Sequence, residues 1–219
     1  MRPPLDPELL IDDDLGFAPE QDYRSGDDAW IRITQRSAGI QPVFTDEERL
    51  SFFRDSLAQA TSTGMEIHAY CVQPRRYHLL VRGERDAVAR GVRELVSVFT
   101  QWINLETSGR GPVLHARSER EIVRETALSK TLTEIHTIPV EAGRLDRPDA
   151  ASWSSYGCYV GTEVPPPWLK VHRVLAHVGG PVAHRDSVTD RIIYLESSNQ
   201  PEIAVPVEEI IPNPYDDND

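Results

Sequence analysis

The chain has 219 residues, 39% of them hydrophobic, and a formal net charge of −12. A chain of this size can bury one well-formed core together with a small appended unit. No stretch approaches the roughly eighteen consecutive apolar residues of a membrane span, and the acidic, proline-containing start of the sequence lacks the basic and apolar regions of a signal peptide. The composition therefore excludes a long apolar span and predicts a cytoplasmic protein.

Most of the negative charge lies at the two ends of the sequence. Residues 1–28 carry a net charge of −7 and residues 162–219 carry −6, whereas residues 29–161 carry +1. A uniformly acidic surface would repel a phosphate backbone, but a nearly neutral centre in which arginine outnumbers lysine does not. We expect an acidic N-terminal arm at 1–28, a folded domain at 29–161, a C-terminal helical extension at 162–198 and an acidic disordered tail at 199–219.

Hydrophobic patterning predicts the elements of the first half. Residues 30–35 alternate apolar and polar side chains, as a half-buried strand does. Residues 45–48 have the pattern of a capping box, with Thr45 as the N-cap, and the apolar residues after it recur at helical spacing. Residues 65–72 and 77–82 predict two strands joined as a hairpin.

The pattern continues through the second half of the folded domain. Apolar residues within 88–103 recur every three or four positions and predict the clearest amphipathic helix of the chain. A short strand is expected at 113–117, and a second capping box at 118–121 is expected to open the helix that carries position 134. The order βαββαβ predicts an α+β, ferredoxin-like antiparallel sheet with helices packed on one face, plus a small C-terminal helical extension.

Residues 68–82 say most about function. They end in a predicted strand, on which residues two apart point to the same face, so Arg76 and His78 share a face. Two imidazoles at such positions can hold a divalent ion against a phosphate, whereas a guanidinium repels the ion and binds the phosphate itself. The pair found here therefore favours an anion over a metal.

Several short motifs resemble those of the single-tyrosine HUH transposases, especially the REP-associated tyrosine transposases that process single-stranded hairpins. The match covers about residues 29–195, with the motifs in the family's order and spacing. They are Ile31 to Gln35 with Arg36 and Ser37, Gln41 to Phe44, His68-Ala69-Tyr70-Cys71, Pro74 through Leu80, Pro139-Val140-Glu141-Ala142-Gly143, Trp153-Ser154-Ser155-Tyr156 and Pro165 to Leu169.

The resemblance implies a specific active site, and most of its groups are replaced here. In the family, two strand histidines and a polar residue one helical turn after the nucleophile hold Mg²⁺ or Mn²⁺, and a tyrosine attacks the scissile phosphate. Carried onto this sequence, the histidines are Arg76 and His78, the nucleophile is Glu134 and the third ligand is Ile138. One imidazole cannot hold Mg²⁺, so the resemblance implies a catalytically degenerate member with no cofactor.

Relocated groups are the alternative to that interpretation. Three tyrosines could serve as a substitute nucleophile, although aromatic residues of this kind more often pack in a core. They are Tyr77, Tyr156 and Tyr159. Glu134 and His136 could rebuild a metal site with His78, but residues two apart on a helix do not face one partner. We therefore expect His78 to be a hydrogen-bonded remnant of the ligand set.

The sequence predicts a transposase-like protein that recognises hairpin or single-stranded DNA without cleaving it, as a monomer or homodimer. Arg75, Arg76 and Arg82 are the expected contacts to phosphate. Two alternatives stay open: a protein-interaction or regulatory module that binds a protein partner on the same fold, and an active DNA-nicking transposase with relocated catalytic groups. No membrane partner is expected.

Overall fold

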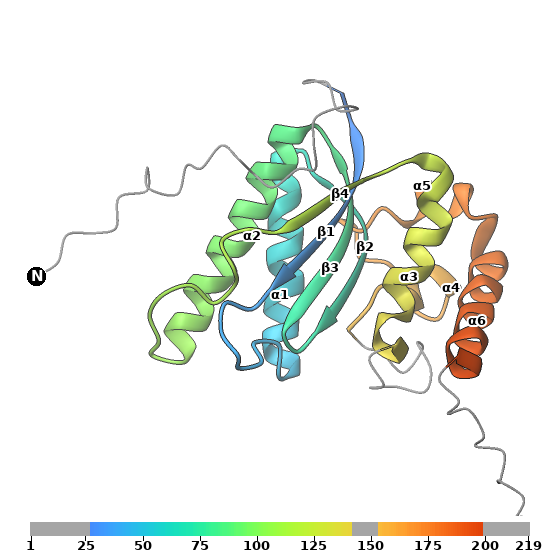
Figure 1. Cartoon of the computed structure of the whole chain (residues 1–219). Helices are drawn as coiled ribbons and strands as arrows, with labels where there is room; N and C mark the ends of the chain where they lie inside the picture. Colours follow the sequence, from blue (N-terminus) through green and yellow to red (C-terminus); the bar gives the residue numbers. More distant parts are fainter. Residues whose placement is uncertain (1–26, 142–152, 199–219) are drawn as a thin grey trace, which may run out of the picture.

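The computed structural model describes residues 27–141 and 153–198 (Figure 1). The acidic arm predicted at 1–28 lies outside the described residues except for its last two, and the tail predicted at 199–219 lies outside them entirely. Within the described residues, no helix combines the length and the apolar character that a membrane crossing requires.

Within the described residues, four antiparallel strands form one sheet in the order β2-β3-β1-β4. They are β1 (Ala29–Arg36), β2 (Glu66–Gln73), β3 (Arg76–Gly83) and β4 (Glu119–Val123). The helix α1 (Glu47–Ala60), followed by the short η2 (Thr61–Thr63), connects β1 to β2, and α2 (Arg85–Glu106) connects β3 to β4. The order is βαββαβ, so the predicted ferredoxin-like fold is confirmed.

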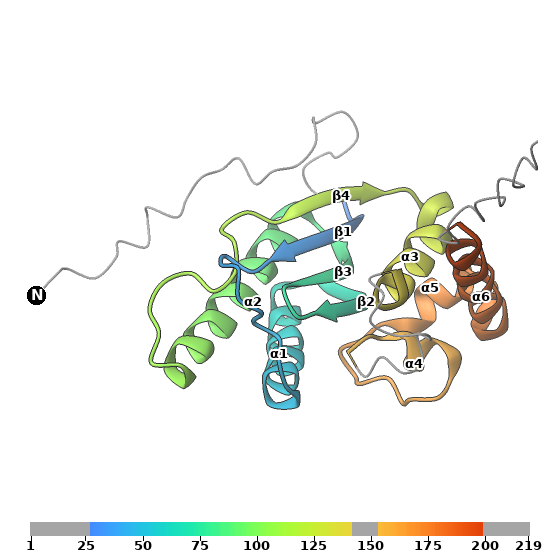
Figure 2. The same ribbon diagram turned by 60° about the horizontal axis from the view of Figure 1, so that its bottom comes forward.

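The helices α1 and α2 cover one face of the sheet (Figures 1 and 2). Odd-numbered residues of β1 and β3 project to this face, where Ile33 and Tyr77 are fully buried. The Tyr77 ring packs against Phe53 of α1 with a centroid separation of 4.9 Å. The predicted amphipathic helix is α2, and its apolar stripe, which includes Phe99, packs into the same core.

The helix α3 (Leu128–Glu141), preceded by η3 (Glu125–Ala127), lies against the other face, where it packs on β2 and β3. Within residues 153–198, three further helices follow it: α4 (Tyr156–Val160), α5 (Val171–His177) and α6 (Gly180–Ser198). Figure 2 shows these helices stacked beside α3, away from α1 and α2. The helices α5 and α6 lie within residues 162–198, where the sequence predicts a helical extension, whereas α4 lies within the predicted domain at 29–161. Together with α3, these helices contact the sheet mainly at β2 and β3.

The fourth strand lies at Glu119–Val123 and not at the predicted 113–117, where Leu114 makes only an isolated bridge to Ser37. The residues predicted to cap α3 therefore belong to a strand instead. Residues 119–123 pair with β1 from Thr34↔Glu119 to Trp30↔Val123. Pairing of backbone groups along the open edge of β1 outweighs the local capping pattern, since an unpaired edge leaves donors and acceptors unsatisfied.

The first helix begins one residue later than the capping box predicts. Asp46, not Thr45, is the N-cap, and its carboxylate accepts a hydrogen bond from the Arg49 backbone N–H at 2.9 Å. The Thr45 hydroxyl donates to the same carboxylate at 2.7 Å. These two hydrogen bonds lower the pKa of Asp46, which keeps it ionised at the positive end of the helix.

Candidate nucleic-acid interface

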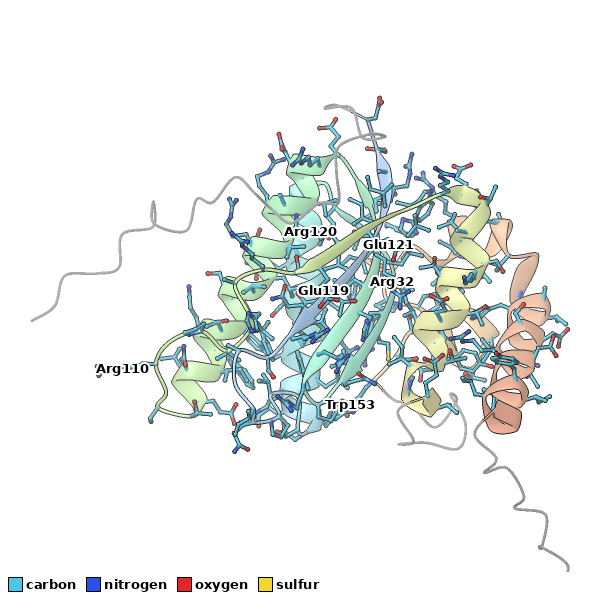
Figure 3. All side chains as sticks on the ribbon, in the orientation of Figure 1. Arg32, Arg110, Glu119, Arg120, Glu121 and Trp153 are labelled. Carbon is cyan, nitrogen blue, oxygen red and sulfur yellow. The ribbon has the colours of Figure 1, made fainter. Side chains whose placement is uncertain are left out.

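A cleft of about 430 Å³ opens on the face of the sheet opposite α1 and α2. Even-numbered residues of β1 and β3 point to this face because strand side chains alternate. The lining residues are Arg32, Thr34 and Arg36 of β1, Arg76 and His78 of β3, and residues 119–121 of β4. Figure 3 shows Arg32, Glu119 and Glu121 along the neighbouring strands β1 and β4.

His78 is a buried, neutral imidazole in this cleft. Its Nδ1 lies 3.0 Å from the Oγ1 of Thr34, the residue directly across from it on β1. Burial, together with the nearby guanidiniums of Arg32, Arg76 and Arg36, lowers the pKa of His78 to about 4. At neutral pH this residue therefore contributes hydrogen bonding to the cleft, and not charge.

Arg36 and Arg76 stand directly opposite each other on β1 and β3. Side chains at such positions have Cβ atoms about 5 Å apart, and like charges placed there are destabilising. Arg36 pairs with the Glu119 carboxylate at 2.9 Å, with both side chains more than half exposed. The Arg76 guanidinium has no hydrogen bond or ion pair with the part of the chain that the structure describes. An anion between the two guanidiniums would remove the repulsion.

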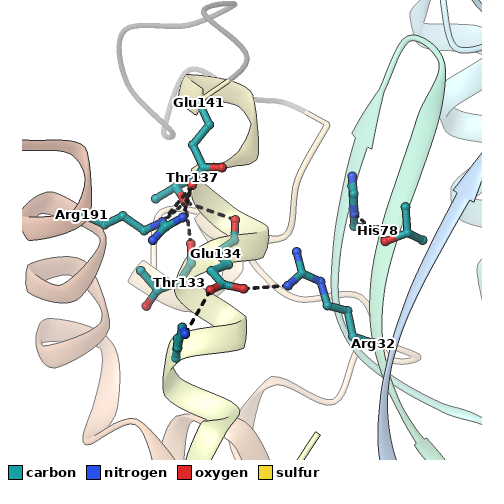
Figure 4. Close-up of polar contacts among 9 residues, drawn as sticks. Arg32, His78, Thr133, Glu134, Thr137, Glu141 and Arg191 are labelled. Atoms are coloured by element: carbon teal, nitrogen blue, oxygen red, sulfur yellow. Dashed lines mark hydrogen bonds and ion pairs between the residues drawn. The ribbon is translucent and has the colours of Figure 1, made fainter. Parts of the chain in front are cut away.

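Glu134 projects from α3 toward the sheet and binds Arg32 (Figure 4). Its Oε2 lies 2.6 Å from Nη1 of Arg32, and its Oε1 lies 3.9 Å from Nζ of Lys130. The fold thus brings position 134 to the sheet face that carries His78, as the resemblance requires. The group found there is a carboxylate held in an ion pair, and the next turn of α3 offers the buried, apolar Ile138.

These donor groups do not fit a divalent cation. Mg²⁺ and Mn²⁺ prefer carboxylate, carbonyl and water oxygens, whereas His78 is surrounded by guanidiniums and the nearby Glu134 is bound to Arg32. Within residues 27–141 and 153–198, no group of three or more His, Cys, Asp and Glu side chains is placed to hold a metal ion. The chemistry of the cleft fits an anion.

His136 is directed away from His78, into the interior between α3 and α6. Its Nδ1 lies 2.8 Å from Nε2 of His184, and its Nε2 lies 2.8 Å from Oγ of Ser155. Burial lowers the pKa of His136 well below its ordinary value. The metal site that Glu134, His136 and His78 could have rebuilt is therefore not assembled by the described residues.

The three tyrosines considered as substitute nucleophiles lie in the core. Tyr77 is on the helix-covered face, and the Tyr159 hydroxyl donates to the His68 carbonyl at 2.7 Å. Tyr156 is buried against Val188 of α6. Burial raises the pKa of both Tyr77 and Tyr159, which makes their phenolates less accessible still. Their positions support a packing role for all three.

The Trp-Ser-Ser-Tyr motif closes one edge of the sheet. The Val72 N–H donates to the Trp153 carbonyl at 2.8 Å, and the Ser155 N–H donates to the Tyr70 carbonyl at 3.0 Å. Between these two bonds, Cys71 forms an antiparallel bridge with the motif. The motif thus pairs with β2 and protects an edge that would otherwise expose unpaired backbone groups.

The structure separates the three arginines that the sequence groups as phosphate contacts. Arg76 faces the cleft, and Arg75 lies exposed at the turn before β3, where its Nη2 donates to the Gly39 carbonyl at 3.3 Å. Arg82 is six residues along the strand from Arg76, a span of about 20 Å. Its guanidinium pairs with Asp28 at 3.0 Å and lies over the Trp30 ring, 5.9 Å from the centroid. Arg82 is therefore not part of the cleft.

Arg32 and Arg36 are the cleft residues that sequence reasoning missed. Both lie on β1, where they alternate with the buried Ile31 and Ile33. That alternation was a usable signal, because it assigns the arginines to the polar face of a predicted strand. The sequence does not give the pairing register between β1 and β3, which brings these arginines to the face of the sheet that carries Arg76.

Arg120 borders the cleft, but its side chain lies on the side of β4 that faces the core. It pairs with Ile33, whose side chain faces the helices. Its Nε donates to the Ser118 Oγ at 2.9 Å, and burial lowers the pKa of its guanidinium. We therefore assign the positive charge of the cleft to Arg32, Arg36 and Arg76, which share its lining with the carboxylates of Glu119 and Glu121.

The sheet order, the two helices on one face and the polar cleft on the other define a ferredoxin-like α+β domain. Among solved structures, the chain is similar to a REP-associated tyrosine transposase bound to a REP hairpin, with a TM-score of 0.55 and 16% identity over 70% of this chain and 91% of that one. A proposed transposase from Deinococcus radiodurans R1 gives a TM-score of 0.38 and 17% identity over 54% of this chain and 95% of that one. No protein-family model and no curated protein matches the sequence. At this identity, the first comparison establishes a transposase-like fold.

Proposed function

We propose that this chain is a transposase-like protein that binds hairpin or single-stranded DNA without cutting it. The observation that carries the proposal is the placement of Arg36 directly opposite Arg76, beside the neutral His78. A phosphate between the two guanidiniums would receive charge-assisted hydrogen bonds from both and relieve their mutual repulsion. The structurally similar transposase is bound to a REP hairpin, so a hairpin is the first ligand to test.

The proposed lack of cleavage rests on the side chains at the reacting positions. Arg76 would repel a divalent cation from the place where the family has a histidine, and Ile138 offers no ligand atom. Glu134 has no phenol with which to form a bond to phosphorus. The approach of Glu134 to the sheet at Arg32 supports this comparison of positions, and the groups found at them could not react as the family's do.

The net charge of −12 repels DNA, but binding through the cleft arginines should weaken strongly as the ionic strength rises. Most of the excess negative charge belongs to residues 1–28 and 162–219, whereas the cleft presents three arginine side chains. We expect measurable binding at about 50 mM salt and a steep loss toward about 200 mM, because each phosphate contact releases condensed counterions.

Fluorescence anisotropy with a labelled DNA hairpin tests the proposal. The double variant Arg36→Ala/Arg76→Ala should weaken binding by about tenfold or more, since both guanidinium contacts to the phosphate are lost. The control is Arg90→Ala/Arg93→Ala, which removes the same charge from two exposed positions of α2 on the other side of the sheet. The control should stay within about twofold of the natural chain.

Two outcomes would contradict the proposal. Equal losses in both double variants would show that only overall charge matters, and no binding by the natural chain at low salt would favour the protein-interaction alternative. A single-stranded oligonucleotide of the same composition distinguishes hairpin recognition from general strand binding, which relies on backbone charge.

A further inference from the structure

Arg32 differs from the other two arginines of the cleft in having a partner from outside the sheet. The Glu134 carboxylate reaches it from α3 at 2.6 Å, and the two side chains are only 23% and 22% exposed. Water screens such a pair less than the exposed pair of Arg36 and Glu119. In the free protein, Arg32 is therefore occupied while Arg76 is available.

We propose that the Glu134 carboxylate stands in for a phosphate on Arg32, so that DNA engages this arginine only by displacing Glu134. The inference rests on the proposed function. Carboxylate and phosphate oxygens bind the same fork of guanidinium N–H donors, so they compete for one side chain. The ion pair also directs the Arg32 side chain toward α3 (Figure 4).

A displaced Glu134 would keep a cation beside it. Lys130 lies one helical turn earlier on α3, with its Nζ 3.9 Å from the carboxylate and its side chain 80% exposed. Pairs at this spacing on a helix surface attract each other. The exchange therefore does not leave a half-buried carboxylate without a partner, which keeps its cost low enough for a phosphate to compete.

The exchange selects for ligands with more than one phosphate. Arg32 and Arg36 lie four residues apart on β1, a span of about 13 Å. A phosphate between Arg36 and Arg76 meets the available Arg76 and the exposed pair of Arg36 and Glu119, whereas a second contact at Arg32 has to displace the less exposed Glu134 carboxylate. A free phosphate ion gains only the first contact, whereas a nucleic-acid strand held at the first can supply the second as an intramolecular step. Glu134 thus positions Arg32 and weakens its hold on small anions.

The test compares two glutamates of α3 that each hold an arginine. Glu134→Gln should bind the DNA hairpin about threefold to tenfold more tightly than the natural chain, because Arg32 then no longer pairs with the Glu134 carboxylate. Glu141→Gln is the control, since Glu141 pairs with Arg191 of α6 at 2.6 Å and loses the same charge on substitution. The control should change the affinity by less than about twofold.

A double variant shows whether the gain depends on Arg32. Arg32→Ala/Glu134→Gln should bind no more tightly than Arg32→Ala alone, because position 32 then has no guanidinium for which carboxylate and phosphate could compete. Glu134→Ala also removes the carboxylate, and alanine is a good helix former. This variant should therefore show the same gain in affinity as Glu134→Gln. Thermal unfolding confirms that each variant is folded.

The inference is overturned if Glu134→Gln gains no more than Glu141→Gln, or if its gain persists without Arg32. In both cases the natural chain still binds the hairpin, and the proposed function stands. If neither the natural chain nor Glu134→Gln binds at low salt, the proposed function itself fails and the inference falls with it.

Discussion

His136 of α3 and His184 of α6 are joined by a hydrogen bond of 2.8 Å between Nδ1 and Nε2. Burial lowers the pKa of His184 to about 4, and burial together with the neighbouring ring lowers that of His136 well below its ordinary value. Both rings are therefore neutral at physiological pH. This pair ties the C-terminal helix to the helix that carries Glu134.

The stability of the protein should fall as the pH falls from about 6.5 toward about 4. In the unfolded chain these histidines have a pKa near 6.5, so within this window the unfolded state binds more protons than the folded state. The stabilisation is complete above about pH 6.5 and is lost on acidification, with a slope of up to about 1.4 kcal/mol per pH unit for each histidine.

Urea unfolding between about pH 7 and about pH 4.5 measures that slope. His184→Leu removes one buried histidine and should reduce it, whereas His172→Gln at an exposed position of α5 should leave it unchanged. A free energy of unfolding that stays constant over this range would show that the pair does not remain neutral in the folded protein.

Ser155→Ala should lower the free energy of unfolding by about 1–3 kcal/mol. Its hydroxyl oxygen accepts from the Tyr70 N–H at 3.0 Å and lies 3.2 Å from the Tyr70 carbonyl and 2.8 Å from His136 Nε2. Removal leaves buried polar groups without their partner. Ser51→Ala, at an exposed position of α1, is the control and should stay within about 0.5 kcal/mol in the same urea titration.

Arg76→Ala should weaken hairpin binding and leave stability unchanged or slightly higher. The loss of one phosphate contact should reduce the salt dependence, the slope of log K against log salt concentration, by about one. Stability should not fall, because the substitution removes a like-charge pair with Arg36. An unchanged salt slope would place the bound DNA elsewhere on the protein.

The natural chain should form no covalent adduct with hairpin DNA in the presence of Mn²⁺. The revertant Arg76→His/Glu134→Tyr/Ile138→Asn restores the imidazole, phenol and polar ligand of the family pattern on a fold that already brings position 134 to the sheet. Denaturing gel electrophoresis detects the adduct directly. Adduct formation by the natural chain would establish relocated catalytic groups, and adduct formation by the revertant alone would support the proposed loss of activity.

Local patterning was sufficient for most of the fold. The strands β1, β2 and β3 and the helix α2 follow from alternation and helical spacing, because side-chain periodicity reports which face is buried. The edge strand β4 was misplaced, since residues 118–121 have a strong local capping pattern and their pairing with β1 is a long-range contact. Local propensity and tertiary pairing compete at such a segment, and here the pairing prevails.

The sequence by itself determined that Arg76 and His78 share a strand face and that a carboxylate occupies position 134. Only the tertiary structure decided which arginines meet there. Register set Arg36 opposite Arg76, and the docking of α3 brought Glu134 to Arg32 across 102 positions of sequence. Periodicity fixes the direction of a side chain within its own element. The distance between elements depends on the packing of the whole core, which cannot be read from a short motif.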